Sequence, residues 1–183
     1  MAGFRYVGSY LGADINGKEK QFAVEAAHTG VLGPGDLVTI TGVSTTTGLP
    51  AVDIAGVGAF TGVVSSIIPN FSGEALSQTW LPALTAGSLL LNVDSKGLYI
   101  ADVFNGPLVA ADVGLNAPSV VTAGTVSGAL YTSNMGINST GKATTATLPW
   151  NIVELLADDA GVLGNRALVR ANETTSNPGS TGI

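Results

Sequence analysis

Cysteine is absent from this chain of 183 residues. Disulfide bonds, thiolate metal ligands and cysteine nucleophiles are therefore excluded as sources of stability or chemistry in this chain. A chain of this length fits one domain and buries roughly 70% of its unfolded surface on folding. We therefore expect a hydrophobic core that is large enough to hold the fold without covalent cross-links.

Charge is also scarce. Charged residues make up 11% of the chain, against about 25% in ordinary soluble domains. Hydrophobic residues stand at an ordinary 45%, so Gly, Thr, Ser and Asn take the place of the missing charge. This composition is typical of a β-rich protein with many tight turns. A weakly charged exterior suits a surface covered by neighbouring subunits better than the surface of a free monomer.

Clusters of positive charge and long apolar runs are missing as well. The seven Lys and Arg residues are scattered singly and the formal net charge is −6, so we expect no nucleic-acid partner. No run of 18 apolar residues is present, and the first residues lack an apolar segment of signal-peptide length. We expect no membrane partner, and we expect synthesis in the cytoplasm.

Residues that could carry chemistry are few. His28 is the only histidine, no Gly-x-Ser-x-Gly motif accompanies it, and we interpret it as a surface or interface residue. Asp158 and Asp159 could bind Ca²⁺, but the residues that follow them offer no further side-chain oxygen. Paired carboxylates for sugar hydrolysis stay open on spacing alone, although only two Trp and four Tyr could serve as sugar platforms. We predict no catalytic residue, no cofactor, no metal and no enzymatic activity.

Short β-strands explain most of the chain. Phe4, Tyr6 and Gly8 share one alternation phase, which favours an extended strand with one aromatic face. The clearest hairpin is predicted where 88–93 and 98–103 flank the turn Asp94–Gly97. Trp150 opens an apolar strand and is expected in the core, whereas Trp80 could be either core or an interface anchor. Residues 19–29 fit either a short helix or a strand, and we favour a strand because the neighbouring segments are strands. The other predicted strands are 37–41, 60–68, 150–156 and 166–171.

Strands at this spacing, separated by Gly and Pro turns, predict an all-β fold. We expect a β-barrel or β-tulip-like body, or a sandwich, with an extended N-terminal arm and long loops. We divide the chain into an N-terminal arm or edge strand (1–12), a single β domain (13–172) and a flexible C-terminal tail (173–183). Within the domain, 69–84 is expected to be a long loop, and 107–117 to contain one helical turn.

Several blocks resemble, in the same order, the capsid cement (decoration) proteins of tailed bacteriophages. They are Gly3–Gly12 with its aromatic and Arg residues, Gly33-Pro-Gly-Asp-Leu-Val38, Phe60-Thr-Gly-Val-Val64, Val113-Gly-Leu-Asn-Ala117, and the closing segment from Ile152 to Leu168-Val-Arg-Ala-Asn172. Together these blocks span nearly the whole chain.

The resemblance implies a structural virion protein that binds the outer surface of the head, bridges neighbouring major capsid protein subunits and stabilises the shell against internal DNA pressure. It implies synthesis in the host bacterial cytoplasm and self-assembly, with a homotrimer favoured and a dimer possible. The alternative is a head-fibre or receptor- or carbohydrate-binding β-domain of a virion. The residues that we expect at the capsid or subunit interface are Phe4, Arg5, Tyr6, Tyr10, Trp80, Arg170 and Asn172.

Overall fold

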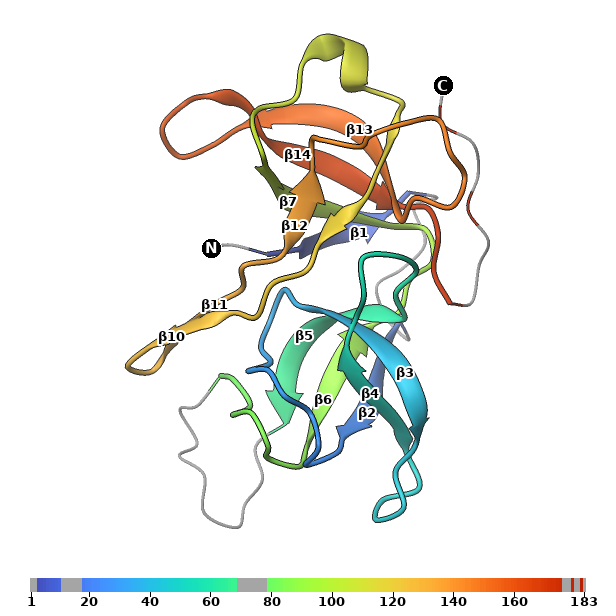
Figure 1. Cartoon of the computed structure of the whole chain (residues 1–183), viewed down its shortest axis with the longest axis vertical. Coiled ribbons are helices and arrows are strands. Elements are labelled where there is room, and N and C mark those ends of the chain that lie inside the picture. The colour runs from blue at the N-terminus through green and yellow to red at the C-terminus, as the bar shows by residue number, and fades with distance from the viewer. Residues whose placement is uncertain (1–2, 11–17, 69–78, 176–178, 180–181, 183) are drawn as a thin grey trace.

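The computed structural model describes residues 3–10, 18–68, 79–175, 179 and 182. These residues form an all-β fold, as predicted, with a closed barrel at one end and a mixed seven-stranded sheet at the other (Figure 1). The first strand of the chain belongs to the sheet, the next five form the barrel, and most of the later strands complete the sheet. Besides a small two-stranded ribbon, the predicted domain over 13–172 therefore contains two larger sheets, the barrel and most of the seven-stranded sheet.

The barrel is built from five strands in the order β2-β4-β3-β5-β6. It closes where β2 runs antiparallel to β6, from Glu19 opposite Asn92 to Val24 opposite Gly87. Its interior is filled mainly by Val and Leu side chains, because alternate residues of each strand point inward. The five strands are β2 (Glu19–Val24), β3 (Leu37–Val43), β4 (Pro50–Ile54), β5 (Gly62–Ile68) and β6 (Gly87–Asn92).

The seven-stranded sheet is centred on β7, which pairs with β14 on one edge and with β1 and β12 on the other. Its strands are β1 (Arg5–Ser9), β7 (Gly97–Phe104), β8 (Asn116–Ala117), β9 (Ser119–Val120), β12 (Gly136–Asn138), β13 (Trp150–Ala157) and β14 (Leu163–Ala171). A separate two-stranded ribbon consists of β10 (Thr125–Ser127) and β11 (Leu130–Thr132). The helical turn predicted within 107–117 is confirmed as the 3-10 helix η1 (Ala110–Asp112).

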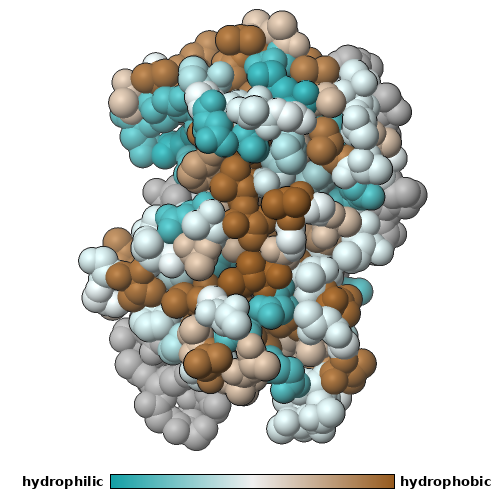
Figure 2. All heavy atoms as spheres, in the orientation of Figure 1, coloured by the Kyte–Doolittle hydropathy of each residue, from teal (hydrophilic) through white to brown (hydrophobic). Residues whose placement is uncertain are grey.

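One hydrophobic cluster joins the sheet to the mouth of the barrel. The rings of Phe4 and Phe60 stack on the Trp150 ring at centroid distances of 4.3 and 4.6 Å. Leu37 and Val63, from the barrel strands, belong to this same cluster. Figure 2 shows hydrophobic side chains gathered across the middle of one face, where the two parts meet. The prediction that Trp150 is a core residue is confirmed.

The predicted hairpin across Asp94–Gly97 is wrong, although both of its strands and its turn exist. The Gly97 N–H donates to the Asp94 carbonyl at 2.9 Å, but β6 pairs with β2 and β5, whereas β7 pairs with β1, β12 and β14. Each strand buries its apolar residues in a different core, since Leu91 faces the barrel interior and Tyr99 the cluster at the sheet. The turn is the point where the chain crosses between the two.

The two strands predicted at 150–156 and 166–171 are confirmed as β13 and β14, which pair with each other as a hairpin. β13 and β14 run antiparallel from Trp150 opposite Ala171 to Ala157 opposite Leu163. The alternation that buries Trp150, Ile152 and Val169 brings the polar residues between them to the opposite face of the sheet.

Both ends of the chain lie against the body over their described residues. β1 is an edge strand on β7 rather than a free arm. In the predicted tail, the Thr175 N–H donates to the Phe60 carbonyl at 2.9 Å, Thr174 is buried, and the Gly182 N–H donates to the Thr144 carbonyl at 3.0 Å. These described residues of the predicted flexible tail therefore contact the body of the domain. The rest of the tail, and 69–78 of the predicted long loop, lie outside the described residues.

Candidate interaction surface

Four of the seven predicted interface residues lie close together on the two strands that flank β7. Arg5 and Tyr6 belong to β1, Tyr10 follows directly after it, and Arg170 lies in β14 on the other side of β7. The Arg170 guanidinium lies 4.8 Å from the centroid of the Tyr10 ring, which is cation–π geometry. Tyr10 keeps 51% of its surface exposed.

Strand register explains which side chains share this face. Tyr99 is buried in the core, so its neighbours Leu98 and Ile100 point to the opposite face of the sheet. Arg5 and Leu168 both pair with Ile100, and Arg170 pairs with Leu98. The outer face of β1, β7 and β14 therefore carries partly exposed aliphatic side chains between two arginines.

Neither arginine of this face forms an ion pair among the described residues, but Arg170 lies over the Tyr10 ring and donates to Asn151 Oδ1 at 3.4 Å, unlike Arg5. Arg5 is exposed, and among the described residues it makes no ion pair and no hydrogen bond. By contrast, Lys18 is bound to Asp94 at 2.6 Å. An exposed guanidinium with five free donors is suited to bind a carboxylate of a partner in a bidentate manner.

Tyr6 is held in place by the same aspartate. Its hydroxyl donates to Asp94 Oδ2 at 3.1 Å. Burial, together with the Asp94 charge and hydrogen bond, raises the pKa of Tyr6 to about 12. Burial also acts to raise the pKa of Asp94, but hydrogen bonds from Lys18, the Lys96 N–H and Tyr6 hold it below its usual range. Tyr6 pairs with the buried Tyr99, and the two rings meet edge to face at a centroid distance of 5.3 Å. Tyr6 therefore lies on the core face of the sheet, opposite to the face that carries Arg5, with its hydroxyl already bound.

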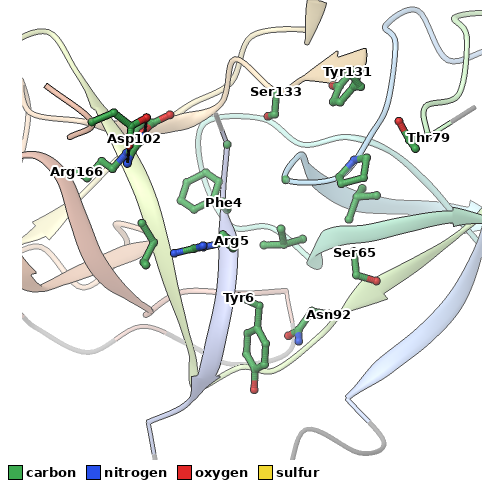
Figure 3. Close-up of a pocket in the computed structure, with 17 residues that line it drawn as sticks. Phe4, Arg5, Tyr6, Ser65, Thr79, Asn92, Asp102, Tyr131, Ser133 and Arg166 are labelled. Carbon is green, nitrogen blue, oxygen red and sulfur yellow. Dashed lines mark hydrogen bonds and ion pairs between the residues drawn. The ribbon is translucent and has the colours of Figure 1, made fainter. Parts of the chain in front are cut away.

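A cleft of about 710 Å³ opens beside β1, between the sheet and the barrel. Figure 3 shows Phe4, Arg5 and Tyr6 along β1, with Ser65 and Asn92 toward the barrel and Asp102 and Arg166 on the other side. At one end of the cleft, backbone hydrogen bonds through Gly35 connect the start of β1 to β5. The Phe4 N–H donates to the Gly35 carbonyl at 3.0 Å, and the Gly35 N–H donates to the Val64 carbonyl at 2.9 Å.

Beyond this junction the backbone edge of β1 faces the cleft. Because alternate residues of an extended strand direct their N–H and C=O groups to the same side, those of Tyr6 point the same way as those of Phe4. An extended segment of another polypeptide could add here as a further strand, with its side chains against the apolar lining.

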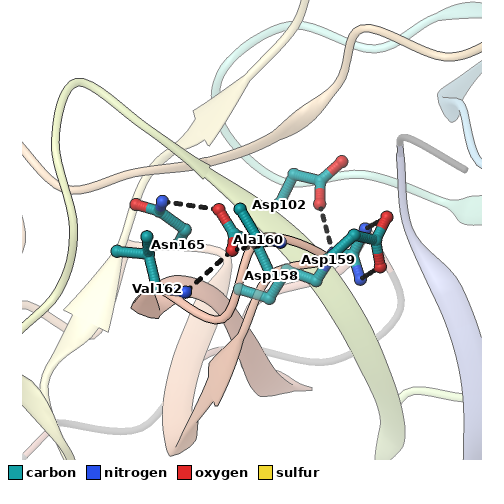
Figure 4. A network of polar contacts seen from close by, with 7 residues as sticks. Asp102, Asp158, Asp159, Ala160, Val162 and Asn165 are labelled. Carbon is teal, nitrogen blue, oxygen red and sulfur yellow. Dashed lines mark hydrogen bonds and ion pairs between the residues drawn. The ribbon is translucent and has the colours of Figure 1, made fainter.

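The rim of the cleft is fixed by the Arg166 side chain. Its Nε lies 3.1 Å from Asp102 Oδ1, and its Nη1 and Nη2 atoms lie 2.7 and 2.8 Å from the two carboxylate oxygens of Asp159. This bidentate pair holds the pKa of Asp159 below its usual range. Figure 4 shows the whole network.

The neighbouring residue, Asp158, stabilises the loop between β13 and β14 through its side-chain hydrogen bonds. Asp158 accepts hydrogen bonds from the N–H groups of Ala160 and Val162, each at 2.9 Å, and from Asn165 Nδ2 at 2.8 Å (Figure 4). The Asn165 bond is the main reason that the pKa of Asp158 lies below its usual range. Both carboxylates thus have protein partners, and the part of the chain that the structure describes contains no group of three acidic or histidine side chains placed to hold a metal.

Phe4 and Asn172 are structural residues, which corrects their prediction as interface contacts. Each is only 3% exposed. Phe4 stacks on Trp150, and Asn172 Nδ2 donates to the carbonyls of Ala146 and Leu148 at 3.2 and 2.9 Å. Trp80 is partly buried beside Leu81 at the barrel, so it belongs to neither strand of the surface described above.

His28 is buried rather than exposed, which corrects its interpretation as a surface residue. It is 2% exposed, and its backbone lies in a turn fixed by the Glu25 carbonyl and the Leu84 N–H. Burial lowers the pKa of His28, and the negative charge of Asp53 acts in the opposite direction. The imidazole is thus a neutral part of the barrel at neutral pH.

The sequence reasoning missed Leu98, Ile100 and Leu168, which complete the surface between the arginines. Their signal was present, because they alternate with buried residues in β7 and β14, but only the pairing of these two strands shows that they share a face. No helix among the described residues is long and apolar enough to cross a membrane. Searches against protein-family models, curated proteins and solved structures found no match.

Proposed function

We propose that this chain is a structural virion protein, a capsid cement protein that binds the outer surface of a phage head. In this role it bridges neighbouring major capsid protein subunits and stabilises the shell against the pressure of packaged DNA. The observation that carries the proposal is the convergence of Arg5, Tyr10 and Arg170 on one sheet face beside an open cleft. The proposal assigns no catalysis to the chain.

The residue types on this face are those that protein–protein interfaces favour. Tyr and Arg are enriched at interface hot spots because they combine apolar area with directed polar groups. Here they surround the aliphatic side chains of Leu98, Ile100 and Leu168. A capsid partner would bury these aliphatic groups and supply a carboxylate to Arg5.

The cleft beside β1 offers a second mode of contact to the same partner. An extended capsid segment that pairs with the Tyr6 backbone would satisfy an open strand edge, and alternate side chains of that segment would enter the cleft. Each such contact is modest in area. Many copies on one shell act together, so the whole coat resists expansion far more strongly than one contact would.

Co-sedimentation with expanded shells of the phage that encodes the chain tests this proposal. Shells stripped of native copies should bind the protein saturably, at a fixed ratio to the major capsid protein, and should then survive more heat. The variant Arg5→Ala/Tyr10→Ala should bind at least about tenfold more weakly, because it loses an ion pair and an aromatic contact. Lys20→Ala is the matched control, since Lys20 is an exposed cation on β2 of the barrel.

Two results would contradict the proposal in different ways. An absence of binding at micromolar protein would reject the cement role and favour the receptor- or carbohydrate-binding alternative, which an array of glycans can then examine. Binding that is equal for the double variant and for Lys20→Ala would keep the cement role but reject this face as its site.

A further inference from the structure

The β10–β11 ribbon extends away from the junction of sheet and barrel (Figure 1). It lies within residues 113–141, the longest stretch of the chain without Asp, Glu, Lys, Arg or His. All three residues of β10 are exposed, and so is Leu130 at the start of β11. A two-stranded ribbon of this kind is marginally stable in water unless something packs against it.

The base of the ribbon is fixed to the barrel through Tyr131. Its ring fills a slot between two glycines: a Cβ atom at Gly33 would lie 2.4 Å from its Cδ1 atom, and one at Gly124 would lie 2.0 Å from its hydroxyl oxygen. The hydroxyl donates a hydrogen bond to the buried carboxylate of Asp36. The ribbon is therefore held in one orientation before any partner binds, which reduces the entropy lost on association.

The turn of the ribbon determines which backbone groups are open. Ser127 pairs with Leu130 across a two-residue loop, and Gly128 at the first loop position has φ +61°, as in a type II′ turn. In such hairpins the two residues that flank the loop bond to each other, so the N–H and C=O of the next residue, Val126, point away from β11. Val126 thus forms an open hydrogen-bonding edge.

Apart from its length of three residues, this edge lacks the features by which proteins prevent strand pairing. Natural edge strands are protected by Lys, Pro, bulges or inward-pointing charges. β10 has none of these, consists of Thr, Val and Ser, and keeps regular register with β11. Its Val126 side chain is 37% exposed.

We propose that β10 pairs antiparallel with β10 of a second copy of this chain, about a two-fold axis at Val126. Each Val126 N–H donates to the Val126 carbonyl of the other copy, so two ribbons become one four-stranded sheet. Val126 lies directly opposite Tyr131 within a ribbon, so the pairing aligns the two valines and the two tyrosines in a single row on one face. Such a contact is isologous and closes at two copies.

The absence of charged residues from the ribbon, rather than the net charge of the chain, is compatible with a second copy as the occupant. Two copies that each carry a net charge of −6 repel each other, and this repulsion is smallest where the contacting segment has no charged residue. The ribbon is the element that combines neutrality, projection and an open strand edge. The inference does not rest on the proposed function, because it concerns the free protein.

Sedimentation velocity of the full chain over about 1 µM to about 1 mM tests the pairing. The wild-type protein should change reversibly from monomer to dimer within this range. Val126→Pro should raise the dissociation constant about tenfold or more, since proline removes the outward N–H from both copies while the bonds of β10 to β11 remain. Val126→Thr keeps this N–H and the β-branched shape, and should associate like the wild type.

A third variant separates the edge from the outer face of the ribbon. Leu130 lies next to Tyr131 and so points to the face opposite Val126, where it is 67% exposed. Leu130→Ser should leave the dimer intact. A monomer at every concentration would overturn the proposal, and so would a trimer, or an association abolished by Leu130→Ser but not by Val126→Pro. Because no shell is present, these outcomes are independent of capsid binding.

Discussion

At the scale of single residues, Asp36 connects three parts of the fold. It is fully buried, and its Oδ2 accepts the Gly33 N–H at 2.9 Å and the Tyr131 hydroxyl, while its own carbonyl accepts the Val64 N–H at 2.8 Å. One residue thus joins the turn at 33–36, the β11 strand and the barrel. Burial raises the pKa of Asp36 to about 6, against the opposing effect of its hydrogen-bond donors Ser133, Tyr131 and the Gly33 N–H.

This raised pKa predicts a pH-dependent difference in stability between the wild type and Asp36→Asn. The folded state holds the proton more tightly than the unfolded state, so the contribution of Asp36 is fully present below about pH 4 and is lost as pH rises to about 6. We expect Asp36→Asn to gain about 3 kcal/mol relative to the wild type between pH 4 and pH 7, from a shift of about two units.

Urea denaturation at a series of pH values measures this difference directly. His28 contributes a dependence of the opposite sign, because its lowered pKa gives stability that is present above the unfolded pKa and is lost as pH falls. Both proteins contain His28, so its effect cancels in the comparison. A difference that stays constant between pH 4 and pH 7 would show that Asp36 does not titrate in this way.

At the scale of elements, the β13–β14 hairpin depends on two glycines that have different surroundings. Gly161 and Gly164 adopt φ angles of +83° and +86°, which L-residues with a side chain disfavour. A Cβ atom at Gly161 would meet nothing within 4 Å, whereas one at Gly164 would lie 2.2 Å from the Leu108 carbonyl oxygen. Leu108 precedes η1 in the chain. Its N–H donates a hydrogen bond to the Gly164 carbonyl at 3.0 Å, so the two backbone segments lie directly against each other.

Substitution of these glycines by alanine separates backbone strain from a steric clash. Gly161→Ala should cost about 1–2 kcal/mol in the free energy of unfolding, from the positive φ alone. Gly164→Ala should cost at least about 2 kcal/mol more, because β14 and the Leu108 backbone must also move apart. Chemical denaturation of both variants gives the two values, and equal losses would contradict the close approach at Gly164.

At the scale of the whole molecule, the barrel and the sheet are separate in hydrogen bonding but share a core. Their strands form distinct sheets, yet the cluster around Trp150 includes Phe60 and Val63 from the barrel side. The parallel bridge between Phe60 and Thr174 adds a link near the other end of the chain. Unfolding of one part would expose the aromatic core of the other.

The shared core predicts that barrel and sheet unfold in a single cooperative transition. Trp150→Phe leaves Trp80 as a probe beside the barrel, and Trp80→Phe leaves Trp150 as a probe of the sheet. In each variant the fluorescence transition should coincide with the far-UV circular dichroism transition of the same protein. Two transitions separated in denaturant would show instead that the barrel and the sheet are independently stable domains.

Local sequence was sufficient for several features of the fold. Alternation and turn residues predict the all-β class, the first two barrel strands β2 and β3, and the strands β13 and β14. These signals act between near neighbours in the chain. The core position of Trp150 follows from the apolar strand that it opens. The candidate surface was recognised in part, through Arg5, Tyr10 and Arg170, whereas Tyr6 faces the core side of the sheet.

The tertiary structure decided what local signals cannot specify. A turn at Asp94–Gly97 looks the same whether its strands pair with each other or enter different sheets, and only the competition of distant strands for β6 and β7 settles this. Burial of Phe4 and His28 likewise depends on residues far away in the chain. The sequence by itself determined where the longer strands β2, β3, β5, β6, β7, β13 and β14 lie and what they offer chemically, because strand propensity is local. Partners and exposed faces were decided by long-range packing, which buries apolar side chains wherever the assembled sheets enclose them.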